Sequence, residues 1–254
     1  MTPRTPKLTR MLGVIFPIAL WFLLTDGFGL VSPSLLPSLS ETFHLVESQW
    51  QRGFLLQDST ATLYRWFCGC ALGLLSGIFG GYLLSLSATF RGLTSASLEF
   101  FRALPVTAIL PLFLLLFGVG DAGKIAMISF PTFLLLTSYV DAAIRSCSRT
   151  RFETLRSFGA TRLQCAYLLI LPEITPTLLL GIRLSLALGL VVAVVSEMFI
   201  GTEHGLGQKV YESYMMNNVS SLYAHIVVIG LLGLFSASVV QLLELQTSTW
   251  KENY

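Results

Sequence analysis

Charged residues are scarce in this sequence, and so are cysteines and histidines. Only 12% of the 254 residues are charged, whereas a soluble domain of this size usually carries about 25%. The formal net charge is +2 and the basic residues form no patch, so no nucleic-acid partner is expected. Neither zinc-type spacing nor a nearby histidine partner is found around the four cysteines, which are Cys68, Cys70, Cys147 and Cys165. This composition argues against a soluble domain, a zinc protein and a nucleic-acid-binding protein.

Hydrophobic residues, in contrast, make up 54% of the chain and lie in long runs. A helix needs about 20 apolar residues to cross the core of a bilayer. The first run also fits a cleavable signal peptide, but bulky Trp21 and Phe22, with no small-residue cleavage pattern after them, favour a retained span. The runs approaching this length are residues 11–25, 63–87, 98–119, 123–143, 177–200 and 222–243. The sequence therefore predicts an all-α, polytopic membrane protein with six transmembrane helices and membrane lipid as its solvent.

These runs divide the chain into three parts. Residues 1–57 form an N-terminal segment with the first transmembrane helix and an amphipathic stretch on the outer surface. Residues 58–243 form a core of five transmembrane helices, in which residues 146–172 are a cytoplasmic loop. Residues 244–254 form a cytoplasmic tail.

The orientation in the membrane follows from the basic residues, which concentrate on the cytoplasmic side of membrane proteins. If the spans alternate, one side receives Arg4, Lys7, Arg10, Arg91, Arg145, Arg149, Arg151, Arg156, Arg162 and Lys251. The other side receives Arg52, Arg65, Lys124 and Lys209. Arg102 and Arg183 lie just inside predicted spans, where a long side chain can extend to water. This asymmetry predicts that both termini are cytoplasmic.

The second predicted span carries a glycine at every fourth position: Gly69, Gly73, Gly77 and Gly81. On a helix this spacing makes one smooth ridge, along which a second helix can approach closely. Tight packing within one subunit is the favoured interpretation of this glycine ridge. A sliding surface used when the transport pathway opens is the alternative.

A segment between the third and fourth predicted spans looks like the phosphate-binding loop of ATPases. It reads Gly118-Val-Gly-Asp-Ala-Gly123-Lys124-Ile125. That loop requires Ser or Thr after the lysine and must link a strand to a helix, whereas here Ile125 follows and both flanks are apolar. The segment is therefore predicted to be a tight turn, without an ATP site.

The loop at residues 146–172 contains two patterns that begin helices. Thr150 with Glu153 and Thr161 with Gln164 both have the spacing of a capping box. Between them, Gly159 can adopt the left-handed conformation that ends a helix. The loop is thus predicted to be two short helices, residues 151–158 and 162–171, with a break before the next span at the proline that follows. Such a rigid, basic elbow is suited to docking a partner.

The same loop resembles the EAA loop of ABC-importer permeases. In that family a Glu-Ala-Ala triplet precedes a glycine, and a Leu-Pro pair follows. Glu153 matches the acid and Gly159 the glycine. Leu171 and Pro172 match the closing pair.

Two positions depart from that pattern, since Thr154 and Leu155 replace the two alanines. The resemblance covers residues 58–243 and continues through Phe117-Gly-Val-Gly120, Leu104-Pro105, Gly181-Ile-Arg183 and Val195-Ser-Glu-Met198. It is strongest to permeases for nitrate, bicarbonate, taurine and aliphatic sulfonates. Permeases for riboflavin and a thiamine precursor are related to these and remain an alternative.

The resemblance implies a type I ABC-importer permease fold in a bacterial inner membrane. It implies that two cytoplasmic ATPase subunits bind the loops of two permease copies, expected to be a homodimer. A periplasmic or lipid-anchored solute-binding protein would deliver the substrate. ATP and Mg²⁺ would bind the partner ATPase, so this chain would have no cofactor and would not itself be an enzyme.

Two ionisable residues and a glycine-rich loop lie outside this motif. Glu197, near the outer end of the fifth predicted span, and Arg183 are candidates for the pathway or a gate, because ionisable residues in spans are often functional. A structural hydrogen bond is the favoured interpretation of Glu197, and Glu153 has a helix cap as its alternative role. The loop at residues 201–207 is predicted to be a flexible turn where the binding protein lands. A secondary transporter is disfavoured because no internal repeat is found.

Overall fold

The computed structural model describes residues 7–248, and every regular element in this range is helical. The predicted tail is described only up to Ser248, and Arg4 and Lys251 lie outside the described residues. The elements in chain order are α1 (Lys7–Phe22), η1 (Leu23–Gly27), α2 (Leu39–Gln51), α3 (Phe54–Leu86), α4 (Ala88–Ala103), η2 (Val106–Ile109), α5 (Leu110–Phe117), α6 (Asp121–Ser146), α7 (Arg149–Ser157), α8 (Arg162–Cys165), η3 (Ala166–Ile170), α9 (Leu171–Ile200), α10 (Leu206–Met215) and α11 (Val219–Ser248).

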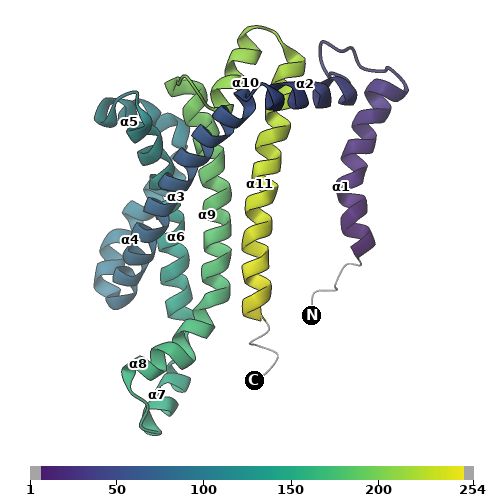
Figure 1. Ribbon diagram of the computed structural model, residues 1–254. Helices are drawn as coiled ribbons and strands as arrows, with labels where there is room; N and C mark the ends of the chain where they lie inside the picture. The colour runs from purple at the N-terminus through teal and green to yellow at the C-terminus, as the bar shows by residue number, and fades with distance from the viewer. Residues whose placement is uncertain (1–6, 249–254) are drawn as a thin grey trace.

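Four helices are long and apolar enough to cross a membrane: Phe54–Leu86, Asp121–Ser146, Leu163–Ile200 and Val219–Leu242. They contain the second, fourth, fifth and sixth predicted spans. Helix α6 packs between α3 and α9, and α11 packs against α9 (Figure 1). Cys70 is 2% exposed in the apolar core that these helices share, in keeping with its role as a small hydrophobe.

The third predicted span is not a single straight helix. Helix α4 and the segment Val106–Phe117 meet at an angle of 94°. Leu104 and Pro105 are both extended at the bend, with ψ of 129° and 127°. A residue before proline is driven out of the helical region by contact with the proline ring, so the helix ends at Ala103. The prediction of one helix over residues 98–119 is wrong, because two helices share this stretch.

The first predicted span is a short apolar helix, Ile15–Gly27, that ends in the π turn η1. It joins the rest of the molecule near its end: the Trp21 indole donates to the carbonyl oxygen of Pro37 at 2.9 Å, and its ring packs on Tyr223. With the bent pair counted as one span, the described residues contain up to five helices that could cross a membrane. The six predicted spans are therefore not confirmed.

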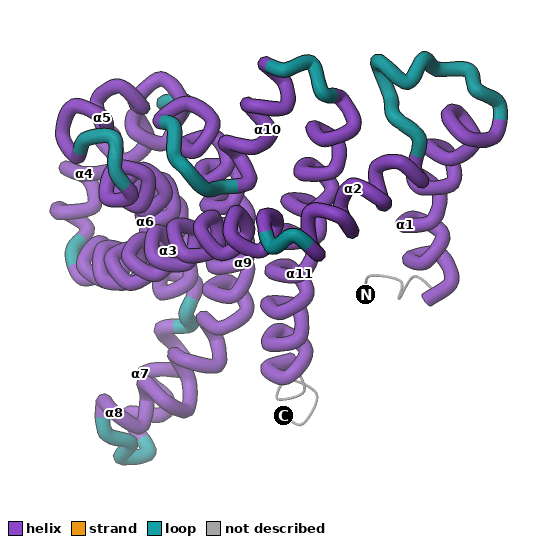
Figure 2. Tube along the Cα trace, turned by 45° about the horizontal axis from the view of Figure 1, so that its top comes forward, coloured by secondary structure: helices purple, strands orange, loops and turns teal. Residues whose placement is uncertain are grey.

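The bundle has two distinct ends (Figures 1 and 2). Helix α2 lies across one end, against the start of α11, and is capped by Ser38, whose hydroxyl accepts from the amide of Glu41 at 3.1 Å. Helices α7 and α8 project from the opposite end. Helix α1 begins and α11 ends toward the side of α7. The end that carries α2 is called the α2 end below, and the end from which α7 and α8 project is called the α7 end.

Candidate functional site

The first candidate site is the elbow formed by α7, Gly159 and α8, at the α7 end. Gly159 has φ of +86°, a value that L side chains resist and glycine adopts freely. The amides of Gly159 and Ala160 donate to the carbonyl oxygens of Arg156 and Leu155, at 3.0 and 3.2 Å. Left-handed glycine closure of this kind ends α7 sharply, so the two helices turn back on each other.

The second predicted capping box is present and the first is not. Thr161 Oγ1 accepts from the amide of Gln164 at 3.2 Å, and the Gln164 side chain accepts from the amide of Thr161 at 2.8 Å. At the start of α7, however, Ser148 is the cap and accepts from the amide of Arg151 at 3.4 Å. Glu153 instead pairs with Arg149, one turn earlier, at 2.8 Å. The cap lies two residues earlier than predicted, because a serine there precedes the helix.

The elbow continues into α9 without a break. Residues Leu163–Ile200 form one helix of 38 residues, in which the π turn η3 precedes Leu171 and Pro172. Pro172 has no amide to donate to the preceding turn, and the wider π turn directly before it accommodates its ring. The prediction that Pro172 breaks the second loop helix from the span is therefore wrong.

Glu173 ties the elbow to α9, and the sequence reasoning missed it. One carboxylate oxygen accepts from the amide of Ser148 at 3.4 Å, and the other lies 3.3 Å from the guanidinium of Arg151. Burial and then the nearby charge of Glu173 raise the pKa of the Cys147 thiol, which keeps it protonated at neutral pH. In the sequence, the one feature that could have indicated Glu173 is its position directly after Pro172.

The exposed surface of the elbow is partly apolar. Phe158 is 84% exposed and Leu163 is 71% exposed, next to the exposed Glu153 and Thr154. Leu155 is half-buried on the opposite face of α7. Large exposed apolar side chains beside charged ones mark surfaces that bind another protein.

The glycine ridge of α3 lies against α6. A Cβ at Gly73 would lie 2.6 Å from the carbonyl oxygen of Ser129, and one at Gly81 would lie 2.5 Å from Cβ of Val140. Gly69 and Gly77 meet the same helix at comparable distances. The ridge thus lets two spanning helices of one chain touch backbone to backbone.

A buried charge cluster joins α3 to α9 at the α2 end; its members are Asp58, Thr62, Arg65 and Glu197. The exposed Asp121, at the start of α6, pairs with it from its edge. The Arg65 guanidinium pairs with Glu197 and with Asp121, each at 2.7 Å. Thr62 Oγ1 donates to Glu197 at 2.9 Å. Glu197 is fully buried and Arg65 is 5% exposed, so two charges that would be costly singly are paired inside the bundle.

The same cluster holds the loop that was predicted to be a flexible turn. The amides of Gly205, Leu206 and Gly207 donate to Asp58, Thr62 and Glu197, at 3.0, 2.9 and 3.0 Å. Gly205 has φ of +156°, and a Cβ there would lie 2.7 Å from the Glu197 carboxyl carbon. The loop before α10 is thus fixed to α3 and α9, contrary to the prediction.

Three further predicted positions are placed by the structure. Lys124 is 2% exposed and its ammonium donates to the carbonyl oxygen of Val119 at 3.3 Å, so it is directed into the protein. Gly118 has φ of +76° in the turn before α6, as the prediction of a tight turn requires. Arg183 lies half-buried on α9, and its place on a pathway or gate stays a prediction.

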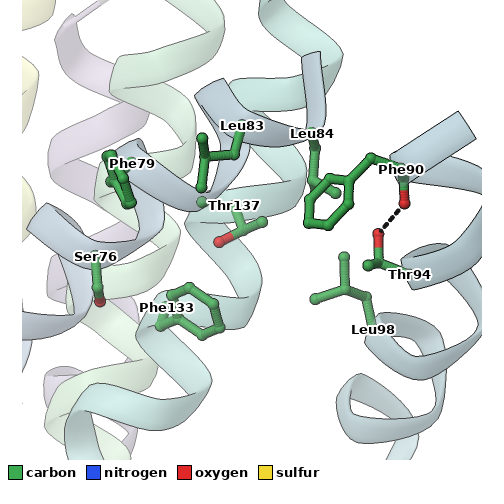
Figure 3. A pocket seen from close by; sticks show the side chains of 10 residues that line it. Ser76, Phe79, Leu83, Leu84, Phe90, Thr94, Leu98, Phe133 and Thr137 are labelled. Carbon is green, nitrogen blue, oxygen red and sulfur yellow. Dashed lines mark hydrogen bonds between the residues drawn. The ribbon is translucent and has the colours of Figure 1, made fainter. Parts of the chain in front are cut away.

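Cavities lie beside the bent pair α4 and α5. One of about 340 Å³ lies between α3, α4 and α6 (Figure 3). No charged side chain lines it among the described residues, and Thr94 donates to the carbonyl oxygen of Phe90 at 2.9 Å rather than to a ligand. A second cavity of about 400 Å³ lies at the bend and includes Arg102.

A family model described as "Binding-protein-dependent transport system inner membrane component" matches residues 69–248, which include the glycine ridge, the elbow and α9. The chain belongs to this family. It is thus a multi-pass membrane protein, an inner-membrane component of an ABC transporter. Its helical bundle with a projecting elbow agrees with the permease role of its relatives.

Curated relatives align with almost the whole permease. "Putative aliphatic sulfonates transport permease protein SsuC" of Bacillus subtilis (strain 168) is 29% identical, with 96% of this chain and 89% of SsuC covered. "Taurine transport system permease protein TauC" of Escherichia coli (strain K12) is 27% identical, with 98% and 92% covered. A chain of the MetNI methionine ABC transporter, in inward-facing conformations, is similar in fold: the TM-score is 0.66 at 20% identity, with 76% of this chain and 96% of that chain covered.

Proposed function

We propose that this chain is the permease subunit of an ATP-driven importer and forms the translocation pathway for a small anion. The anions considered are nitrate, bicarbonate, taurine and aliphatic sulfonates. The names of SsuC and TauC favour the sulfonate group among them, since taurine is itself a sulfonate. A solute-binding protein would deliver the anion at the α2 end.

The observation that carries this proposal is the elbow at the α7 end. It turns sharply at Gly159, exposes Glu153 and Phe158, and continues into a 38-residue helix. A helix of this length extends for about 57 Å at 1.5 Å per residue. A force on the elbow is therefore applied to a rigid rod whose far end holds Glu197 in the buried charge cluster.

This geometry suggests how the partners are arranged. Each elbow would dock on one ATPase subunit, which binds ATP and Mg²⁺ itself. Two ATPase subunits need two elbows, and closed two-fold pairing is the commonest oligomer, so a homodimer of this chain is proposed. Closure of the ATPase pair would push the elbows and tilt both α9 helices, which opens the pathway between the copies.

The basic residues support an orientation with the α7 end in the cytoplasm. Arg65 and Lys124, which the sequence placed on the outer side, are buried in the bundle and do not face water. Arg52 and Lys209 are then left on that side, while the elbow carries several arginines. If α1 with η1 forms one span and the bent pair α4 and α5 forms another, the chain has six spans and both termini lie in the cytoplasm.

Import by the reconstituted complex tests the proposal. The chain would be co-purified with its ATPase subunits, combined with its binding protein, and placed in liposomes with ATP inside or outside. We expect import of labelled taurine or ethanesulfonate that requires the binding protein and ATP on the elbow side. Nitrate, bicarbonate, riboflavin and a thiamine precursor serve as comparison substrates. Uptake by the chain alone without ATP would contradict the proposal and favour a secondary transporter.

A further inference from the structure

The cavity of about 400 Å³ lies at the bend between α4 and α5, at mid-depth in the bundle. Helix α6 runs over Asp121–Ser146, and the residues that it gives to the cavity are 130–135, near its middle. Helix α9 contributes Leu188, also near its middle. Small-molecule sites are commonly clefts of about 300–1,000 Å³ with apolar walls and few polar groups. The volume and the position thus suit a small solute that is crossing the bundle.

Arg102 is the charged side chain that lines this cavity, among the residues that the structure describes. Its Nη1 donates to the hydroxyl of Ser138 at 3.3 Å. No described carboxylate lies within the 4.0 Å that defines an ion pair with it. Arg65 and Arg91, in contrast, both have acids as partners. Arg102 is exposed on the single chain, and an ionisable residue within the apolar stretch of a membrane protein is a candidate for the substrate pathway.

The surroundings of Arg102 suit an anion that carries a short apolar tail. A guanidinium presents a planar fork of donors, which matches two oxygens of an oxyanion better than a lysine does. Around it, Phe101 and Phe130 pack edge to face at 5.7 Å, and Leu188 completes an apolar wall. Nitrate or bicarbonate would bind the donors of the guanidinium but has no apolar part that could contact these walls.

Resting on the proposed importer function, we infer that Arg102 and this cavity form a subsite that binds the sulfonate group of the cargo within the membrane. The arginine binds the head group, and the apolar walls receive the methylene groups next to it; the ammonium at the end of taurine gains nothing from these walls, so ethanesulfonate should bind at least as tightly as taurine. The bend at Leu104 and Pro105 is what opens the space for it. The subsite is distinct from the buried charge cluster, whose arginine is already neutralised.

Equilibrium binding of labelled taurine to the permease–ATPase complex in lipid nanodiscs, without the binding protein, tests this subsite. Arg102→Gln should weaken binding by about tenfold or more, because a charge-assisted hydrogen bond is lost, and Arg102→Lys should weaken it less. Arg52→Gln is the control and should stay within about twofold of wild type. Unlabelled ethanesulfonate should displace taurine from the wild-type complex far better than the uncharged ethyl methyl sulfone does.

Three results would overturn the inference. Unchanged taurine affinity in Arg102→Gln would show that the anion binds elsewhere. Equal displacement of taurine by ethanesulfonate and by ethyl methyl sulfone would show that the site does not recognise a negative charge. Absence of taurine binding by the wild-type complex would also remove the subsite. Import with the binding protein, measured separately on the wild type, then decides whether the proposed function itself stands.

Discussion

The Arg65 guanidinium and the Glu197 carboxylate lie 2.7 Å apart, although 132 residues separate them in the sequence. This pair joins α3 to the far end of the helix that begins at the elbow. The amide of Gly207, in the loop before α10, also donates to Glu197. The pair therefore anchors one end of the rod that is proposed to transmit the motion of the ATPase.

Removing one partner of this pair should destabilise the protein. Arg65→Gln leaves the Glu197 carboxylate buried without its cation, and breaking a buried pair in this way costs about 3–5 kcal/mol. Glu197→Gln should cost less, because Asp121 still pairs with Arg65. Thermal unfolding in detergent measures both, with Arg52→Gln as the surface control. An unfolding temperature of Arg65→Gln equal to that of wild type would refute the role of the pair.

The glycine ridge should tolerate no added methyl group. Gly73→Ala places a Cβ 2.6 Å from the carbonyl oxygen of Ser129, so we expect a loss of about 1–3 kcal/mol from overpacking. Gly92→Ala is the matched control, because a Cβ at this helical glycine meets nothing within 4 Å. It should be neutral or stabilising by up to about 1 kcal/mol. Equal unfolding temperatures for the two variants would be evidence against close contact of α3 and α6.

Glu153 should matter for docking more than for folding. Its side chain is 63% exposed and pairs with the 91% exposed Arg149, and such surface pairs contribute about 0–1 kcal/mol. Glu153→Ala should therefore unfold like wild type but retain less ATPase subunit on co-purification. Arg149→Ala breaks the same pair and keeps the acid, so it should retain more. If both variants retain the ATPase as wild type does, Glu153 only supports its own helix.

The isolated chain should not bind ATP through the segment that ends in Lys124. Its ammonium is directed into the protein and donates to Val119, and no Ser or Thr follows it. Equilibrium dialysis with labelled ATP should show no binding by the purified chain, while the complex with the ATPase binds. Tight ATP binding by the chain alone, abolished in Lys124→Ala, would contradict this assignment.

Long apolar runs and local spacings could be predicted from the sequence because they depend on neighbours in the chain. The four long helices, the glycine series from Gly69 to Gly81 and the turn at Gly159 are of this kind. Pro105 interrupts the third apolar run and indicates a kink there, but the extent of the bend at Leu104 and Pro105 could not be predicted. A proline in an apolar run is compatible with a straight, kinked or broken span.

The buried charge cluster could not be predicted, because its members meet only after folding. Arg65 looked like a basic residue of the outer side, and its partner Glu197 lies on another helix. Ser148 and Glu173 were missed for a related reason. Ser148 and Thr150 can both cap a helix, and which of them caps α7 depends on how α7 lies against Glu173 at the start of α9.

The most direct test of the whole account is ATP hydrolysis stimulated by the loaded binding protein, compared in Gly159→Val and Gly159→Asn. A β-branched residue resists the φ of +86° found here, whereas asparagine tolerates it. A Cβ at this position meets nothing within 4 Å, so the two variants differ in backbone strain and not in crowding. At matched expression, the account predicts that Gly159→Val loses most of the stimulation and of the co-purified ATPase, and that Gly159→Asn keeps both. Wild-type stimulation in Gly159→Val would mean that the elbow does not couple the ATPase to α9.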